Sequence, residues 1–165
     1  MAKREAPPRP PRSQKLTEYL RPQHIKLKLR SKSRDGVLEE LVNLFPLEPR
    51  PRALLLDMLK QREKLGSTSV GKGVAIPHGR SVVVSRLMIA CGRTEEGVDW
   101  DSADGKPVSL FFAIAAPPIE VGNLYHPTLA RVVELVRDAG LRKRLLAAAD
   151  AETFWQVIDD EATGE

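Results

Sequence analysis

The chain has 165 residues, and 42% of them are hydrophobic, which predicts a single domain with a substantial buried core. Its single cysteine excludes an internal disulfide and indicates a reducing compartment. No apolar run approaches the roughly 18 residues of a membrane span, and the N-terminus lacks the apolar stretch of a signal peptide, so we expect a cytoplasmic protein.

The chain begins with a basic, proline-rich segment, residues 1–14. This composition predicts a disordered tail with polyproline tendency, because it offers almost nothing that can pack. The tail either aids solubility or attaches weakly to an acidic partner or nucleic acid. Nucleic acid is the less favoured partner, since no aromatic residue is interleaved with the cations. We assign the folded domain to residues 15–160 and a short C-terminal tail to residues 161–165.

The first half of the domain alternates strand and helix patterns. Residues 25–30 alternate apolar and basic side chains, which predicts a half-buried strand; we assign no function to the preceding His24. Apolar residues at three- and four-residue steps predict helices near 37–42 and 52–65. Residues 70–76 predict a short strand interrupted by glycines, and the proline and glycine that follow should leave His78 on an exposed turn.

The second half predicts the centre of the sheet. Apolar runs at 82–84, 87–90 and 108–115 indicate central strands, bounded by Gly92 and by a turn at 101–107. Helical periodicity then governs three segments near 129–136, 141–146 and 154–158. Helices before, between and after the strands predict an α/β fold, a three-layer α/β/α sandwich with a mixed β-sheet.

One apparent motif is misleading. Gly66, Gly71 and Lys72 have the spacing of a nucleotide-binding P-loop, but Gly73 stands where that motif needs serine or threonine to hold magnesium. The loop also follows a predicted helix and leads into a strand, which is the reverse of P-loop context. These departures argue against ATP binding.

The same stretch carries a more specific pattern. An Arg-Glu pair, then Gly-Ser-Thr, a small-residue loop, an apolar-Ala-apolar-Pro run and His-Gly follow one another without a gap over residues 62–79. This pattern resembles the active-site signature of the type-2 enzyme IIA proteins of the bacterial phosphoenolpyruvate-dependent phosphotransferase system, the fructose, mannitol and nitrogen-regulatory group. The resemblance continues more weakly over about 16–160.

The resemblance implies a phosphorylation site at His78. In the family, the matching histidine accepts a phosphoryl group from the histidine-containing phosphocarrier protein, through Nε2, with residues matching Arg62 and Ser67 beside it. The chemistry is consistent with this, because a neutral imidazole has a lone pair for attack on phosphorus near pH 7. A guanidinium can bind two phosphoryl oxygens, and loop amides can stabilise the charge that develops.

The remaining candidates each have two alternative roles. Lys64, Lys72 and Arg80 either add positive potential or are simply solvated. The family carries a second active-site histidine at a position that here is Tyr125, with His126 one place later. Either His126 still reaches the site from the start of the helix, or the Tyr125 hydroxyl substitutes for it. The three histidines and one cysteine have no short metal-ligand spacing, so we expect no metal or cofactor.

Two functional classes remain. One is a sugar-specific phosphocarrier that passes phosphate to a IIB component. The other is a regulator of the nitrogen-regulatory type, whose phosphorylation state changes its choice of target protein. The sequence shows no fused IIB or transporter domain, which favours the regulator. A degenerate binding module is disfavoured, because the expected nucleophile and its neighbours are intact.

Overall fold

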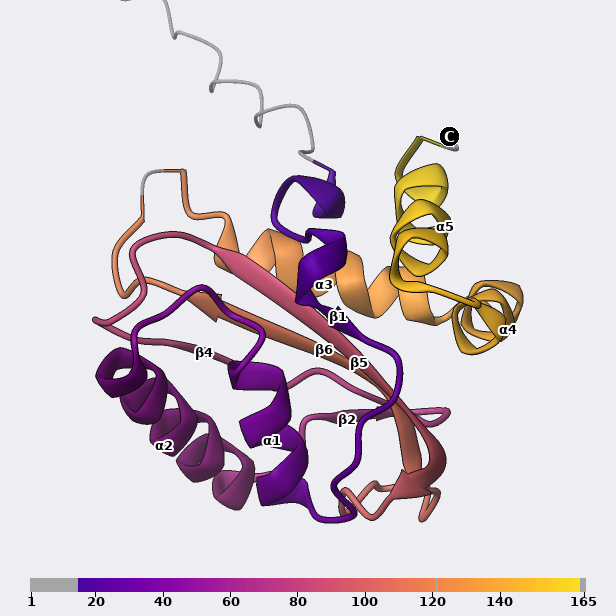
Figure 1. The fold of residues 1–165 in the computed structure, drawn as a ribbon, viewed down its shortest axis with the longest axis horizontal. Coiled ribbons are helices and arrows are strands. Elements are labelled where there is room, and N and C mark those ends of the chain that lie inside the picture. Colours follow the sequence, from indigo (N-terminus) through magenta and orange to yellow (C-terminus); the bar gives the residue numbers. More distant parts are fainter. Residues whose placement is uncertain (1–14, 121, 164–165) are drawn as a thin grey trace, which may run out of the picture.

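A computed structural model describes residues 15–120 and 122–163, which form five α-helices around a six-stranded mixed sheet (Figure 1). The strands are β1 (Ile25–Lys26), β2 (Ser69–Gly71), β3 (Val74–Ala75), β4 (His78–Arg80), β5 (Met88–Val98) and β6 (Val108–Ala116). The helices are α1 (Arg34–Val42), α2 (Pro49–Leu65), α3 (Tyr125–Val136), α4 (Ala139–Ala147) and α5 (Ala151–Thr163), with short 3-10 helices η1 (Leu16–Glu18) and η2 (Pro22–His24) at the start. The expected tail at 1–14 lies outside the described residues, as do positions 164–165.

The sheet has the order β1-β5-β6-β3-β2, and β4 also pairs with β6. The long β5 and β6 pair antiparallel, whereas β1 is parallel to β5 and both β3 and β4 are parallel to β6. The sheet is therefore mixed, as expected. Within the described ranges, no helix combines the length and apolar content that a membrane span requires.

Helices cover both faces of the sheet, which gives three layers. In Figure 1, α1 and α2 lie on one side of the strands and α3, α4 and α5 on the other. Strand β6 alternates between the two cores: Leu110, Phe112 and Ile114 face the α3–α5 side, while Phe111 and Ala113 face the α1–α2 side. This double burial explains why the sequence of β6 is a continuous apolar run.

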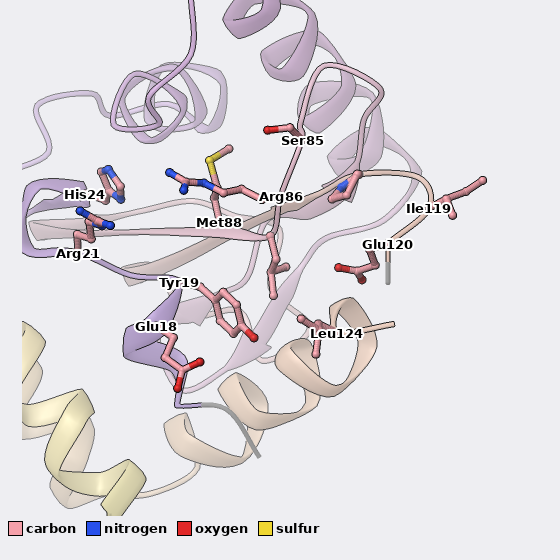
Figure 2. Close-up of a pocket in the computed structure, with 12 residues that line it drawn as sticks. Glu18, Tyr19, Arg21, His24, Ser85, Arg86, Met88, Ile119, Glu120 and Leu124 are labelled. Carbon is pink, nitrogen blue, oxygen red and sulfur yellow. The ribbon is translucent and has the colours of Figure 1, made fainter. Parts of the chain in front are cut away.

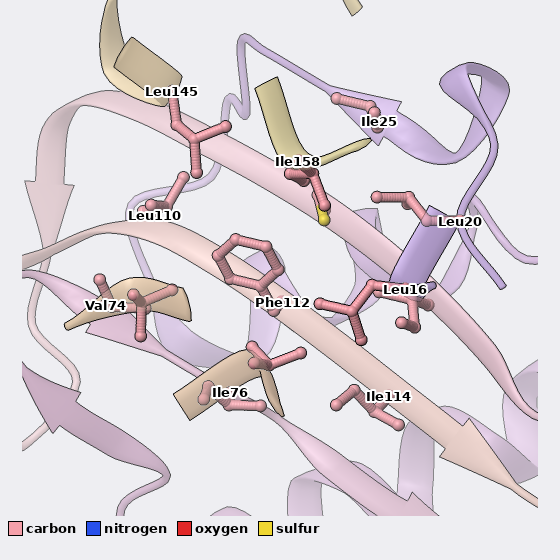
Figure 3. Packing of buried hydrophobic residues seen from close by; sticks show 14 of the residues in the cluster. Leu16, Leu20, Ile25, Val74, Ile76, Leu110, Phe112, Ile114, Leu145 and Ile158 are labelled. Carbon is pink, nitrogen blue, oxygen red and sulfur yellow. The ribbon is translucent and has the colours of Figure 1, made fainter. Parts of the chain in front are cut away.

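The core on the α3–α5 side joins distant parts of the chain. Figure 3 shows Leu16 and Leu20 from the N-terminal segment packed near Phe112 of β6 and Ile158 of α5. The indole of Trp155 in α5 also donates a hydrogen bond to the carbonyl oxygen of Leu20 at 2.7 Å. These contacts close the helical layer over the sheet and confirm the predicted three-layer α/β/α architecture.

The prediction of a strand at 82–84 was wrong. These residues form a turn, closed by a hydrogen bond from the Val84 amide to the Ser81 carbonyl oxygen at 3.1 Å. The ladder to β6 ends with the Ser81 amide donating to the Ala116 carbonyl oxygen, and β6 itself stops before Pro117. Within the part of the chain that the structure describes, residues 82–84 therefore have no neighbouring strand with which to pair.

The glycine-interrupted segment 70–76 is not one strand but parts of two. Strands β2 and β3 form an antiparallel hairpin, in which Gly71, Lys72 and Gly73 have positive φ angles of 81°, 57° and 77°. Two glycines in three positions make this left-handed turn accessible. His78 is also not on an exposed turn: it is half-buried and is the first residue of β4.

Two further boundaries differ from expectation. Gly92 does not end a strand, because β5 continues to Val98; a Cβ at Gly92 would lie 2.7 Å from Leu29 Cδ1 and 2.9 Å from Leu41 Cδ2, so the glycine permits close packing. The strand expected at 25–30 is reduced to β1, although the Leu29 amide still donates to the Arg93 carbonyl oxygen.

Candidate active site

His78 is held by its own backbone surroundings. Its Nδ1 lies 2.6 Å from the carbonyl oxygen of Ile76. A carbonyl oxygen can only accept, so Nδ1 carries the proton in this contact and Nε2 of the neutral ring keeps its lone pair. The strand is fixed in turn by β6, since the Ile114 amide donates to the Pro77 carbonyl oxygen at 2.9 Å.

The surroundings of His78 favour the neutral ring. Burial lowers the pKa of His78 below its usual value of 6.5, and the charges of Arg62 and His126 lower it further. The hydrogen bond to Ile76 and the charge of Glu63 act in the opposite direction without reversing the shift. A neutral His78 with a free Nε2 is the form that can act as a nucleophile.

Arg62 reaches the site from the last turn of α2. Its Nη1 donates to the Gly66 carbonyl oxygen at 2.8 Å, which ties the side chain to the loop that follows the helix. Its charge affects the pKa of both His78 and Tyr125, so the guanidinium lies within electrostatic reach of both rings. The structure thus brings Arg62 and His78 together, although they are separated by 15 intervening positions in the sequence.

Helix α2 packs directly on the strand that carries His78. A Cβ built on Gly79 would lie 2.4 Å from Met58 Sδ and 2.6 Å from Met58 Cε. A side chain at this position would have to displace the methionine. Gly79 therefore permits the close approach of α2 to β4 and keeps Arg62 near the imidazole.

The loop after α2 is anchored by a buried network that sequence reasoning missed. The Thr68 amide donates to Glu63 Oε2 at 3.0 Å, and the Thr68 hydroxyl donates to the other carboxylate oxygen. Trp100 Nε1 donates to the same hydroxyl at 3.3 Å. The sequence signal for Glu63 was its place beside Arg62 in the signature, whereas Trp100 had no local signal.

Ser67 is held by the same loop. Its hydroxyl donates to the Trp100 carbonyl oxygen at 2.6 Å and accepts from the Ser69 amide at 3.2 Å. The only hydroxyl proton is thereby engaged with the backbone. In this arrangement Ser67 orients the loop, and it would have to rotate to donate to a phosphoryl group.

Both candidates at the start of α3 lie around His78. Tyr125 is 6% exposed, and its ring centroid is 6.2 Å from that of His78. His126 is exposed, its ring lies 5.1 Å from that of Tyr125, and its charge lowers the pKa of His78. Both side chains thus lie near His78, so both alternatives stay open.

Arg80 connects β4 to the segment before α3. Its Nη1 donates to the Pro117 carbonyl oxygen at 3.0 Å, and it forms an ion pair with Glu120 at 3.7 Å. The guanidinium carbon lies 4.5 Å from the centroid of the Tyr125 ring, and Glu120 Oε1 accepts from the Tyr125 amide at 2.7 Å. Arg80 and Glu120 therefore position Tyr125, and Glu120 was not anticipated from sequence.

Two predicted cations are less central. Lys72 lies at the tip of the β2–β3 hairpin, where its amide donates to Asp104 Oδ2 at 3.0 Å. Lys64 is exposed on α2. Unlike Arg62, Glu63 and His126, neither of these two lysines contributes to the shift in the pKa of His78.

Three of the most exposed large apolar side chains belong to segments that carry site residues. Leu65 and Val82 are each 87% exposed and Ile119 is 91% exposed. They belong to the segments that carry Arg62, Arg80 and Glu120, respectively. Within the described ranges, no group of histidine, cysteine and acidic residues could hold a metal ion.

Comparison with known proteins identifies the family of this chain. The family model of the phosphoenolpyruvate-dependent sugar phosphotransferase system, EIIA 2, matches residues 18–161. The chain is 35% identical over 144 residues to a nitrogen regulatory protein of Bradyrhizobium diazoefficiens, covering 87% of this chain and 94% of the relative. It is also 34% identical over 147 residues to a fructose-specific EIIABC component of Bacillus subtilis, covering 88% of this chain but only 23% of that longer protein.

A solved structure shows the same likeness. The crystal structure of the nitrogen regulatory protein IIA-Ntr from Neisseria meningitidis superposes with a TM-score of 0.79 at 34% identity, covering 87% of this chain and 98% of that one. The family match extends over most of the chain and includes all the candidate site residues. This protein therefore belongs to the EIIA type-2 family of the phosphoenolpyruvate-dependent phosphotransferase system.

Proposed function

We propose that this protein carries a phosphoryl group on Nε2 of His78 and receives it from the histidine-containing phosphocarrier protein. The observation that carries the proposal is the contact between His78 Nδ1 and the Ile76 carbonyl oxygen at 2.6 Å. It keeps the proton on Nδ1 and leaves the lone pair on Nε2. Since burial also lowers the pKa of His78, the reactive neutral form prevails near pH 7.

The proposed phosphoryl transfer needs neither a cofactor nor a separate base. The Nε2 lone pair attacks phosphorus, the new N–P bond forms, and the N–P bond of the donor phosphohistidine breaks with its electron pair returning to the donor ring. The Ile76 carbonyl oxygen stabilises the positive charge that develops on the His78 ring. Arg62 stabilises the negative charge spread over the phosphoryl oxygens.

The other site residues would act by positioning. Glu63 and Ser67 hold the loop after α2, and Arg80 holds Tyr125. Either the exposed His126 or the Tyr125 hydroxyl completes the site on the α3 side. We propose that the exposed apolar groups Leu65, Val82 and Ile119 form the surface on which the phosphocarrier protein docks.

The protein's role in the cell is proposed to be regulatory. Relatives named nitrogen regulatory protein, from Bradyrhizobium and Neisseria, match at 35% and 34% identity. In this role, the phosphorylation state of His78 decides which target protein binds. The second candidate is a sugar-specific carrier that passes phosphate to a IIB component, and the 34% identity to a fructose-specific relative supports it.

The test is reconstituted phosphorylation. The protein is incubated with phosphoenolpyruvate, the first enzyme of the system and its phosphocarrier protein, and acid-labile phosphate is located by mass spectrometry. We expect one phosphate on His78 and none on His78→Ala, with His126→Ala still labelled. Because His78 is only half-buried, His78→Ala should keep the fold, which circular dichroism checks. Full labelling of a folded His78→Ala protein would show that the acceptor lies elsewhere.

A further inference from the structure

A cavity of about 530 Å³ lies at the edge of the sheet, beside η1, η2 and the start of β5, and Figure 2 shows its lining residues on both sides of that strand. Its walls come from η1 and η2, from the beginning of β5 and the residues just before it, and from the segment that leads into α3. The volume is within the range of sites that bind small molecules. His78 is not among the residues that line it.

One part of the cavity carries unbalanced positive charge. Figure 2 shows the nitrogen atoms of Arg21, His24 and Arg86 gathered together. The charges of both arginines lower the pKa of His24, after burial, so the three groups lie within electrostatic reach of one another. Within the described part of the chain, neither Arg21 nor Arg86 makes a side-chain hydrogen bond or an ion pair. Uncompensated cations around a cavity attract an anion.

Two buried polar atoms of the lining lack a partner. Tyr19 Oη and His24 Nδ1 are buried and have no hydrogen bond to any described residue. Most buried polar atoms in folded proteins are satisfied, and an exception requires an explanation such as a bound molecule. Because Tyr19 and His24 both line the cavity, a ligand there can supply the missing partners.

The rest of the lining has a different character. Glu18 and Glu120 both lie near Tyr19, since their charges contribute to raising its pKa, which burial raises most. In Figure 2 these carboxylates lie away from the cationic cluster, near Tyr19 and Leu124. This part of the cavity disfavours a second anionic group and favours a hydrogen-bond donor.

We propose that this cavity binds a small phosphomonoester whose body carries hydroxyl groups. The phosphate contacts Arg21, His24 and Arg86. Two forked guanidinium groups and an imidazole can bind the three oxygens of a phosphate, whereas a ligand carboxylate would offer them only two oxygens. The hydroxyl groups of the ligand donate to Glu18 and Glu120. A hydroxyl can also donate to or accept from Tyr19 Oη, which needs such a partner.

The cavity shares two lining residues, Ile119 and Glu120, with the proposed docking surface and with the support of Tyr125. Glu120 lines the cavity and also accepts from the Tyr125 amide and pairs with Arg80. Ligand binding needs neither His78 nor Arg62. Failure of the cavity proposal and failure of the proposed phosphorylation are therefore separable.

The experiment is isothermal titration calorimetry on the full chain with glucose 6-phosphate, glucose, inorganic phosphate and succinate. We expect saturable one-to-one binding of glucose 6-phosphate, at least about tenfold weaker binding of inorganic phosphate and of succinate, and none of glucose. Arg21→Ala and Arg86→Ala should each weaken glucose 6-phosphate binding about tenfold or more, since each removes a charge-assisted contact. Both arginines are exposed, so these variants should fold.

The control variants are Arg50→Ala and His78→Ala. Arg50 is an exposed arginine on α2 that does not line the cavity, and His78 belongs to the other site. Both variants should bind glucose 6-phosphate with wild-type affinity. The proposal is overturned if glucose 6-phosphate does not bind, or if inorganic phosphate or succinate binds as tightly. It is also overturned if Arg21→Ala and Arg86→Ala bind normally, or if Arg50→Ala or His78→Ala loses binding.

Discussion

Glu63 and Thr68 are joined by two hydrogen bonds that end on one buried carboxylate. The Thr68 amide donates to Glu63 Oε2 at 3.0 Å and the Thr68 hydroxyl donates to Oε1. Glu63 is only 4% exposed, so water cannot replace these partners. The pair fixes the loop between α2 and β2 to the last turn of the helix that presents Arg62.

Glu63→Ala should lower the free energy of unfolding by about 1–3 kcal/mol, because it leaves a buried amide and a buried hydroxyl without their acceptor. Urea denaturation followed by circular dichroism measures the loss. Lys64→Ala is the matched control, because Lys64 is the next residue on α2 and its side chain is exposed. This variant should change the free energy of unfolding by no more than about 0.5 kcal/mol. Equal stability of the two variants would mean that the carboxylate does not anchor the loop.

Arg62→Ala should leave His78 as the phosphate acceptor but slow its phosphorylation by a factor of roughly 10² to 10³. The reason is the loss of one group that stabilises charge on the phosphoryl oxygens. Initial rates with the phosphorylated phosphocarrier protein give the factor. Lys64→Ala removes an equal charge from the same helix and should change the rate little. If both variants slow transfer equally, Arg62 acts only through general attraction.

Separate His126→Ala and Tyr125→Phe variants decide which side chain completes the site on the α3 side. Tyr125→Phe keeps the ring under Arg80 and removes only the hydroxyl, whereas His126→Ala removes an exposed imidazole. Slower phosphorylation in Tyr125→Phe alone assigns the role to the tyrosine, and slower phosphorylation in His126→Ala alone assigns it to the histidine. If neither changes the rate or the lifetime of the phosphorylated form, the role is lost in this chain.

The pH dependence of the protein's stability follows from the pKa of His78, which is lowered chiefly by burial. The unfolded chain takes up this proton near pH 6.5, before the folded protein does. The stability that the neutral ring contributes is therefore complete above that pH and is lost as the pH falls through the folded-state pKa. Nuclear magnetic resonance titration of the histidine ring should give a midpoint below 6.5. A midpoint above 6.5 would contradict the burial of the His78 ring in the folded protein.

The same titration tests the neighbouring charges. Arg62 lowers the pKa of His78 and Glu63 raises it, so Arg62→Ala should move the midpoint up and Glu63→Ala should move it down. Shifts in the same direction would contradict the arrangement of these two groups around the imidazole.

The regulatory proposal predicts that phosphorylation changes partner choice. A phosphoryl group adds up to about two negative charges beside Arg62 and the exposed apolar surface. A target protein captured from the native cell should therefore bind the two forms with affinities at least about tenfold apart, or roughly 1.4 kcal/mol. His78→Ala is the control that cannot be switched. Equal affinities, together with efficient transfer to a IIB protein, would favour the sugar-specific carrier.

The sequence alone determined the elements whose signals are local. The apolar steps of α2 and α5, and the continuous apolar run of β6, were predicted because burial on one face or on two imposes a period on neighbouring residues. These patterns gave the three-layer fold. The ordered signature from Arg62 to His78 was equally local, and it identified the family that the comparisons then confirmed.

Only the tertiary structure decided the features that depend on partners distant in sequence. Residues 82–84 have strand composition but, among residues 15–120 and 122–163, no adjacent strand, because β6 ends before Pro117. The Ser67 hydroxyl is engaged by the Trp100 carbonyl oxygen, 33 positions away, which no local pattern encodes. Arg80 and Glu120 meet around Tyr125 for the same reason. Hydrogen-bond partners and strand neighbours are properties of the packed chain, so the chemistry of this loop could be read only after folding had brought them together.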